Sequence, residues 1–183
     1  MAPSYILSAV VAGISLSLLF LAATVETLTL PVATNALVPF LTNRRRTYRE
    51  EFLEVHNKYR AMVNLPPLTW DRNLTRYARR WGAKRAIDCK IVHSFGPYGE
   101  NMFWGRLDHW TPSKVVDSWG EEGQHYHMNN NQCDAGQMCG HYTQIIWKET
   151  LRLGCARIRC LNGEFLVICE YDPPGNYVSE KPV

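Results

Sequence analysis

The segment that decides the fold is Cys139–Trp147, which reads CGHYTQIIW. In an extended chain, alternate residues of 142–147 point to opposite faces, and both faces then carry apolar side chains. We therefore predict a strand over 142–147, with His141 at its mouth, where an imidazole can face a cleft while its neighbours are buried. A lone histidine beside a glycine is more often structural than functional, so the interpretation of His141 depends on the other polar residues near turns.

Three such residues, His93, Glu100 and Glu122, lie upstream among similar turn-forming residues. Together with His141 they fit three kinds of site: a zinc-type metal site, a general acid–base centre, or a buried hydrogen-bond network. Their spacing does not choose among the three. Because the chain lacks the HExxH and GxSxG motifs and has no cysteine left over as a nucleophile, an enzyme is the weaker interpretation.

Composition indicates one globular domain. Hydrophobic residues make up 46% of the chain and charged residues 20%, which is typical of a folded protein. The formal net charge of +3 is too small to favour nucleic acid, and we see no basic stripe interleaved with base-stacking aromatic residues. We therefore predict no nucleic-acid partner. We also expect a monomer.

The N-terminal region reads as a targeting segment followed by a spacer. Residues 6–25 are almost wholly apolar and carry no charge, so 1–25 is either a cleaved signal peptide or an uncleaved membrane anchor. Small residues at 22–24 offer a cleavage point, and we favour the signal peptide. Residues 26–47, with prolines and the triplet 44–46 of arginines, read as a linker or propiece. The folded domain is predicted over 48–183.

The cysteines indicate an oxidising compartment. Their even number, behind an apolar N-terminus, predicts disulfides and secretion. Six cysteines allow about 15 pairings, which the sequence by itself does not resolve. Asn73 begins an Asn-Leu-Thr sequon and is a predicted glycosylation site in a secreted chain. The cysteines are Cys89, Cys133, Cys139, Cys155, Cys160 and Cys169.

Helices are predicted in the first part of the domain and strands in the last. Thr47 and Glu50 form a capping box that starts a helix running to Val63. Thr111-Pro112 starts another helix, because proline is tolerated in a first turn. Asn162-Gly163 predicts a hairpin turn. The further predictions are a helix from Asp71 to about Ile87, an irregular segment 89–105, a polar loop 124–138, strands 154–159 and 165–171, and an extended tail from Pro173.

Four other polar side chains invite attention. His56 and Arg60 lie four residues apart on the flank of the first helix, and we interpret them as anchors of the helix edge rather than catalytic groups. His125 and His127 alternate in the polar loop. They fit either a metal-binding pair or a solvated loop, and we favour the loop.

Several motifs, in this order and spacing, resemble the CAP superfamily of cysteine-rich secretory proteins, antigen 5 and pathogenesis-related protein 1. The resemblance covers about 48–183, and the tail Pro-Pro-Gly-Asn-Tyr is most similar to the plant pathogenesis-related protein 1 branch. The motifs are His56-Asn57-x-x-Arg60, Leu68-Thr69-Trp70-Asp71, His93-Ser94, Gly99-Glu100-Asn101, Gly140–Trp147, Gly154-Cys155-Ala156 and Tyr171–Tyr177.

The resemblance implies an α+β fold: an α-β-α sandwich with a central antiparallel sheet and three disulfides. It also implies the disulfide pairs Cys89–Cys160, Cys133–Cys139 and Cys155–Cys169. It places a cleft tetrad on His93, Glu100, Glu122 and His141, where relatives can hold a divalent ion such as Zn²⁺.

The resemblance further implies a function. We expect a secreted, apoplastic defence protein that binds a sterol or another lipid, is not an enzyme and requires no cofactor. Two alternatives stay open: a zinc-dependent hydrolase that uses the tetrad, and a precursor whose C-terminal segment, 173–183, is released as a signalling peptide for a receptor.

Overall fold

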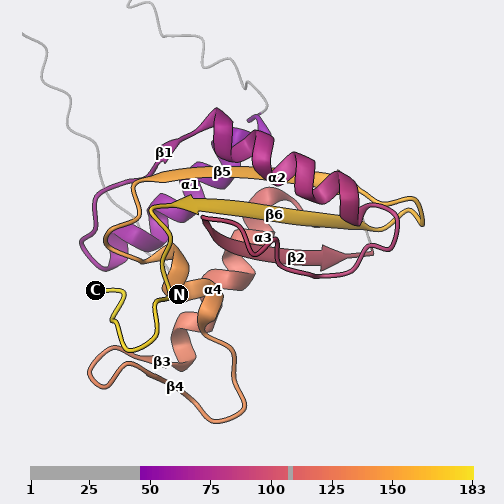
Figure 1. The fold of residues 1–183 in the computed structure, drawn as a ribbon. Helices are drawn as coiled ribbons and strands as arrows, with labels where there is room; N and C mark the ends of the chain where they lie inside the picture. The colour runs from indigo at the N-terminus through magenta and orange to yellow at the C-terminus, as the bar shows by residue number, and fades with distance from the viewer. Residues whose placement is uncertain (1–45, 107–108) are drawn as a thin grey trace, which may run out of the picture. The chain divides into compact units, whose positions relative to one another are not determined.

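The computed structural model describes residues 46–106 and 109–183 (Figure 1). The predicted signal peptide and most of the predicted linker, residues 1–45, lie outside this part, so these predictions stay predictions. Within the described part, no helix is both long and apolar enough to cross a membrane. The main elements are α1 (Tyr48–Met62), β1 (Thr69–Trp70), α2 (Arg72–Arg85), β2 (Gly99–Gly105), α3 (Pro112–Gly120), α4 (Gly140–Ile145), β5 (Arg152–Arg159) and β6 (Phe165–Asp172).

The three longer helices begin where the sequence predicts. The capping box is present, because Thr47 N donates to Glu50 Oε2 (2.8 Å) and Glu50 N donates to Thr47 Oγ1 (3.3 Å). The side chain of Asp71 accepts the first N–H groups of α2, and Thr111 caps α3. Helix α2 ends at Arg85, slightly before the predicted Ile87.

The central sheet has the strand order β1-β5-β6-β2. Strands β5, β6 and β2 are antiparallel, as expected, while β1 pairs in parallel with β5 over two residues. The irregular segment predicted over 89–105 is wrong in its second half, which forms β2. This strand begins and ends with glycine and is largely buried, so it shows neither a strand-like composition nor a clean alternation of apolar and polar residues.

Strand β6 divides the core into two layers. Its odd-numbered residues, including Val167 and Tyr171, face the main core with α1, α3 and α4. On the other face Ile168 packs with Ala78 of α2. Figure 1 shows α2 covering one side of the sheet, with α3 and α4 on the other. The predicted α-β-α sandwich is confirmed.

The predicted strand over 142–147 is wrong. Residues 140–145 form the short helix α4, and Ile145, Ile146 and Trp147 are buried. A short apolar run that is buried on all sides has no period of its own, and it does not distinguish a strand from a turn of helix. His141 therefore sits in the first turn of a helix, not at the mouth of a strand.

Three disulfides link the described cysteines, with none left free, in the pairs that the resemblance implies. Cys89–Cys160 joins the segment after α2 to the β5–β6 turn across 71 residues of sequence. Cys155–Cys169 crosses between register partners of β5 and β6.

The C-terminal tail is part of the folded unit. Asn176 Nδ2 donates to the carbonyl of Gly140 at the start of α4 (2.8 Å). Lys148 N donates to the carbonyl of Pro182 (2.8 Å), and Pro182 is buried. The segment 173–183 thus packs against α4 and the residues that follow it.

Candidate functional site

A cleft of about 600 Å³ lies between the loop after α2, strand β2, helix α4 and the tail. His93, Glu100 and His141 line it, and Glu122 contacts His141 from outside the lining. The structure thus brings the four predicted residues together as two histidine–glutamate pairs.

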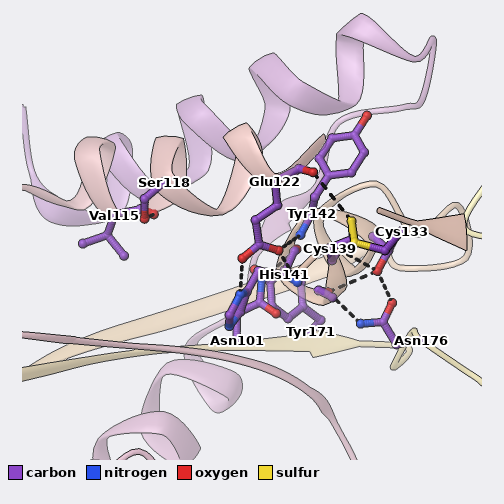
Figure 2. Close-up of polar contacts among 12 residues, drawn as sticks. Asn101, Val115, Ser118, Glu122, Cys133, Cys139, His141, Tyr142, Tyr171 and Asn176 are labelled. Carbon is purple, nitrogen blue, oxygen red and sulfur yellow. Dashed lines mark hydrogen bonds and ion pairs between the residues drawn. A yellow bond between two sulfur atoms is a disulfide. The ribbon is translucent and has the colours of Figure 1, made fainter. Parts of the chain in front are cut away.

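In the first pair, Glu122 both orients the imidazole of His141 and caps α4. The Nδ1 of His141 lies 2.6 Å from Glu122 Oε1. The other carboxylate oxygen accepts the backbone N–H groups of His141 (3.0 Å) and Tyr142 (3.3 Å). Figure 2 shows Glu122 directed at His141, with Asn101 and Tyr171 close by. On its ring face, His141 stacks against Trp119 with 5.7 Å between centroids.

Two glycines let the segment that carries Glu122 approach its neighbours closely. A Cβ on Gly120 would lie 2.1 Å from the ring of Tyr59, and one on Gly123 would lie 2.9 Å from the ring of Tyr142. Aromatic rings therefore pack directly on the backbone on both sides of Glu122, and this packing fixes the backbone that carries its side chain.

The second pair is His93 and Glu100. Glu100 Oε1 lies 2.7 Å from His93 Nδ1 and accepts the N–H of Ser94 (2.9 Å). The hydrogen bond with Glu100 raises the pKa of His93. Burial by itself would raise the pKa of Glu100, but the hydrogen bonds from His93 and Ser94 lower it overall. The pair therefore favours an ionised carboxylate beside a histidine that keeps its proton to a higher pH than usual.

Glu100 faces a buried carboxyl group on the next strand. Glu170 is its register partner on β6 and is 0% exposed. Among the described residues, Glu100 Oε2 and both carboxyl oxygens of Glu170 have no hydrogen-bond partner. Burial, and then the negative charge of Glu100, raise the pKa of Glu170 to about 9. Glu170 is therefore neutral at pH 7, and its proton can be donated toward Glu100.

A hydrogen-bond chain runs from the cleft into the core. Asn101 Nδ2 donates to the carbonyl of His141 and to the Tyr171 hydroxyl, both at 3.0 Å. His56 Nε2 lies 2.7 Å from that hydroxyl, and His56 Nδ1 lies 2.7 Å from the carbonyl of Phe52. Burial lowers the pKa of His56 to about 4, so the ring is neutral, donates from Nδ1 and accepts the tyrosine proton at Nε2.

Known proteins resemble this chain in sequence and in fold. The model of the cysteine-rich secretory protein (CAP) family matches residues 53–171. The chain belongs to the CAP family. Its relatives include tobacco (Nicotiana tabacum) pathogenesis-related protein 1C, which is 46% identical over 73% of this chain and 80% of its own length. Pathogenesis-related protein PR-1 of Medicago truncatula is 46% identical over 76% and 81% respectively. This is a PR-1-like pathogenesis-related protein, and these relatives' names state no enzymatic reaction.

Solved structures share the CAP fold. BmVAL-1 superposes with a TM-score of 0.63 at 25% identity, over 77% of this chain and 84% of that one. The venom allergen-like protein 4 of Schistosoma mansoni superposes with a TM-score of 0.60 at 24% identity, over 75% and 94%. The likeness confirms the α+β sandwich inferred above.

Two residues of the CAP motifs turn out to be core residues. His56 and Arg60 are both 0% exposed. The prediction that they lie at the edge of the helix is therefore wrong, because both lie in the core. Burial lowers the pKa of Arg60 to about 10. Its guanidinium group donates to the carbonyls of Ile145, Trp147 and Thr150 at and after the end of α4. It also donates to the carbonyl of Pro66, in the segment after α1.

Sequence reasoning did not single out Asn101, Tyr171 and Glu170. Asn101 and Tyr171 belong to CAP motifs, and this membership is the only sequence signal of their role. Glu170 stood inside a predicted strand with no motif to mark it.

The polar loop of the CAP domain holds its two histidines around one carboxylate. His125 and His127 contact Asp134 at 3.1 Å and 2.7 Å, with Asp134 about half exposed. Across residues 46–106 and 109–183, no group of three or more histidine, cysteine, aspartate or glutamate side chains is arranged to hold a metal ion. The predicted loop 124–138 is wrong in part, because the short strands β3 (Tyr126–His127) and β4 (Gln132–Cys133) pair within it. The choice between a solvated pair and a metal-binding pair at His125 and His127 stays a prediction.

The tetrad offers a metal ion two imidazole nitrogens. In both His93 and His141 the Nδ1 atom is engaged by a carboxylate, which leaves Nε2 free for a ligand. Carboxylates that contact the far nitrogen of a metal-bound histidine are a common supporting arrangement. Within residues 46–106 and 109–183, no third histidine, cysteine, aspartate or glutamate side chain joins them in a group that could hold a metal ion.

Asn73, the predicted glycosylation site, lies in the exposed first turn of α2. Its side-chain oxygen accepts a hydrogen bond from Arg76. Occupancy by a glycan stays a prediction.

Proposed function

We propose that this CAP protein is a secreted defence protein that binds a sterol or another lipid in its cleft and catalyses no reaction. The observation that carries the proposal is the pairing of apolar and polar groups in one cavity. Phe95 is 91% exposed and Met138 is 62% exposed, and both line the cleft that holds His93 and His141. Large apolar side chains with such exposure indicate a surface that a ligand can cover.

A sterol suits this lining because it carries one hydroxyl group on a rigid apolar body. The hydroxyl can exchange hydrogen bonds with the imidazoles, while the apolar body removes Phe95 and Met138 from water. The volume of about 600 Å³ lies within the range of small-molecule sites in proteins.

Secretion is supported by the disulfides and by the relatives. Three disulfides persist in oxidising compartments such as the plant apoplast, and the similar proteins are pathogenesis-related proteins of plants. Mass spectrometry of the protein secreted by a plant host gives the mature N-terminus and the occupancy of Asn73.

The proposal is tested by equilibrium binding of a fluorescent sterol. The double substitution Phe95→Ser and Met138→Ser should weaken binding at least about tenfold, since covering one such side chain contributes roughly 1.5–3 kcal/mol. The matched control is Leu161→Ser with Val178→Ser, two residues that are 80% and 93% exposed and do not line the cleft. No saturable binding at micromolar sterol, or equal losses in both variants, would reject the proposal.

A second candidate function uses the same cleft: binding of Zn²⁺ by the two imidazoles. It is favoured by the orientation of His93 and His141, both held through Nδ1. Calorimetric titration with ZnCl₂ should show binding that His141→Ala removes. The hydrolase alternative additionally requires turnover that Zn²⁺ stimulates, and a broad substrate panel without turnover in either condition removes it.

The precursor hypothesis concerns 173–183. The segment is tied to Gly140 and Lys148 by hydrogen bonds, so its release requires both cleavage and detachment. A search of extracellular fluid for the tail peptide by mass spectrometry tests it, and repeated absence under induction would sink it.

A further inference from the structure

A second cavity, of about 620 Å³, lies at the edge of the sheet, away from the cleft residues. It exists because β1 is too short to cover its neighbour. β1 pairs with β5 only at Arg152 and Leu153, and the cavity opens beside the next part of β5, at 155–157. The start of α1 forms one wall and the first two turns of α2 form another.

Five of the residues that line this cavity are arginines, and none of the lining residues is acidic. Three of them recur at helical spacing on one face of α2, which contains no acidic residue of its own. Like charges at this spacing repel, and positive charge at a helix N-terminus is unfavourable. The stripe formed by Arg72, Arg76 and Arg79 therefore lowers the stability of the free protein. The arginines are Arg49, Arg72, Arg76, Arg79 and Arg157.

Three of the five cationic groups are available to a ligand. Arg49, Arg72 and Arg79 are exposed and make no ion pair or side-chain hydrogen bond with any residue in the described part of the chain. Arg157 is held in place by the ring of Phe165, which lies 4.0 Å from its guanidinium carbon.

Aromatic rings accompany the charges. Tyr48 is 54% exposed, Trp70 is half-buried, and both line the cavity. A flat apolar ring face packs well against the C–H face of a sugar ring, while the guanidinium fork matches a carboxylate in two parallel hydrogen bonds. The cavity thus offers both elements that an acidic sugar needs.

The spacing requires an extended anion. Arg72 and Arg79 are seven residues apart, or about 10 Å along the helix axis, so a single small anion does not reach both ends of the stripe. A chain of sugars with one carboxylate per ring does. A nucleic acid is disfavoured because the whole chain has a net charge of only +3.

From these observations we propose that the cavity between α1, α2 and the exposed edge of β5 binds an acidic oligosaccharide, with carboxylates on the arginines of α2 and a sugar ring on Tyr48, the more exposed of the two aromatic residues. The site is separate from the lipid cleft, so each can be lost without the other.

Titration calorimetry of the purified protein with an oligomer of galacturonic acid tests the proposal. The triple variant R72Q, R76Q and R79Q keeps good helix-forming residues and should weaken binding at least about tenfold. The charge-matched control R80Q, K84Q and K114Q removes the same charge from residues that do not line this cavity, and should change the affinity by less than about twofold. Circular dichroism confirms that both variants fold.

Three further measurements complete the test. The methyl-esterified oligomer, which has the same rings without the charge, should bind far more weakly, and Tyr48→Ala should weaken the acidic oligomer while leaving weak binding of inorganic phosphate unchanged. Equal losses in the two triple variants, or equal affinity for the ester, would overturn the proposal. Displacement of the oligomer by inorganic phosphate or a single-stranded oligodeoxynucleotide at comparable concentration would overturn it in favour of those anions.

Discussion

Glu170 makes the folded protein sensitive to pH in a direction opposite to that of most carboxyl groups. In the unfolded chain its pKa is 4.5, and in the folded protein burial beside Glu100 raises the pKa to about 9. Between these values the folded state binds a proton that the unfolded state does not. The contribution of this group to stability is therefore fully present below about pH 4.5 and is lost as pH rises toward 9.

The substitution Glu170→Gln removes this dependence. Glutamine is neutral at every pH and still presents an N–H group toward Glu100, so it imitates the protonated carboxyl group. At pH 7 the wild-type protein must protonate Glu170 on folding, about 2.5 pH units above its ordinary pKa, which costs about 3 kcal/mol. The variant should be more stable than the wild type by up to this amount at pH 7, and nearly equal to it at pH 4.

Urea denaturation at pH 4 and pH 7 measures the difference. The control is Glu149→Gln, whose side chain is 50% exposed and forms an exposed ion pair with Lys148, and which should change stability by less than about 1 kcal/mol at either pH. A stability difference for Glu170→Gln that is the same at pH 4 and pH 7 would refute the reasoning. A loss of stability at pH 7 would do so as well, because it would mean that the carboxylate is ionised and favourably solvated in the fold.

Two further predictions concern stability. Replacing Cys89 and Cys160 by serine opens a loop of 71 residues and should cost about 4 kcal/mol in urea denaturation, against about 2 kcal/mol for the disulfide with a separation of six residues; equal losses would contradict the loop-length argument. Gly120→Ala should destabilise by about 1–3 kcal/mol because its Cβ meets the ring of Tyr59, although alanine is the better helix former. Gly140→Ala, which meets nothing within 4 Å, is its control and should change the melting temperature little.

The start of α1 and the turn between β5 and β6 could be predicted from local sequence rules. Thr47 and Glu50 fixed the start of α1 because their hydrogen bonds span only one turn. Asn162-Gly163 fixed the hairpin between β5 and β6, with Gly163 at a φ of +86° that favours glycine. Such signals can be found from the sequence because each depends on neighbours within a few residues.

The cleft did not follow from local rules. Helix α4 depends on the carboxylate of Glu122, which accepts the N–H groups of His141 and Tyr142 across about 20 residues of sequence. The role of Glu170 depends on its strand register with Glu100, 70 residues away. Both contacts form only when the sandwich assembles, so the sequence indicated the four cleft residues through motif resemblance but not how they pair.

The docking of the tail has a consequence for proteolysis. A protease needs an extended segment of substrate in its active site, and the segment around Pro173 is held by the strand on one side and by the hydrogen bonds of Asn176 and Pro182 on the other. Cleavage therefore waits for local opening, and its rate follows the fraction of molecules that are open. Heat, or a reducing medium that opens the disulfide Cys133–Cys139 beside α4, should therefore make this segment easier for a protease to cut, even at a constant level of protease.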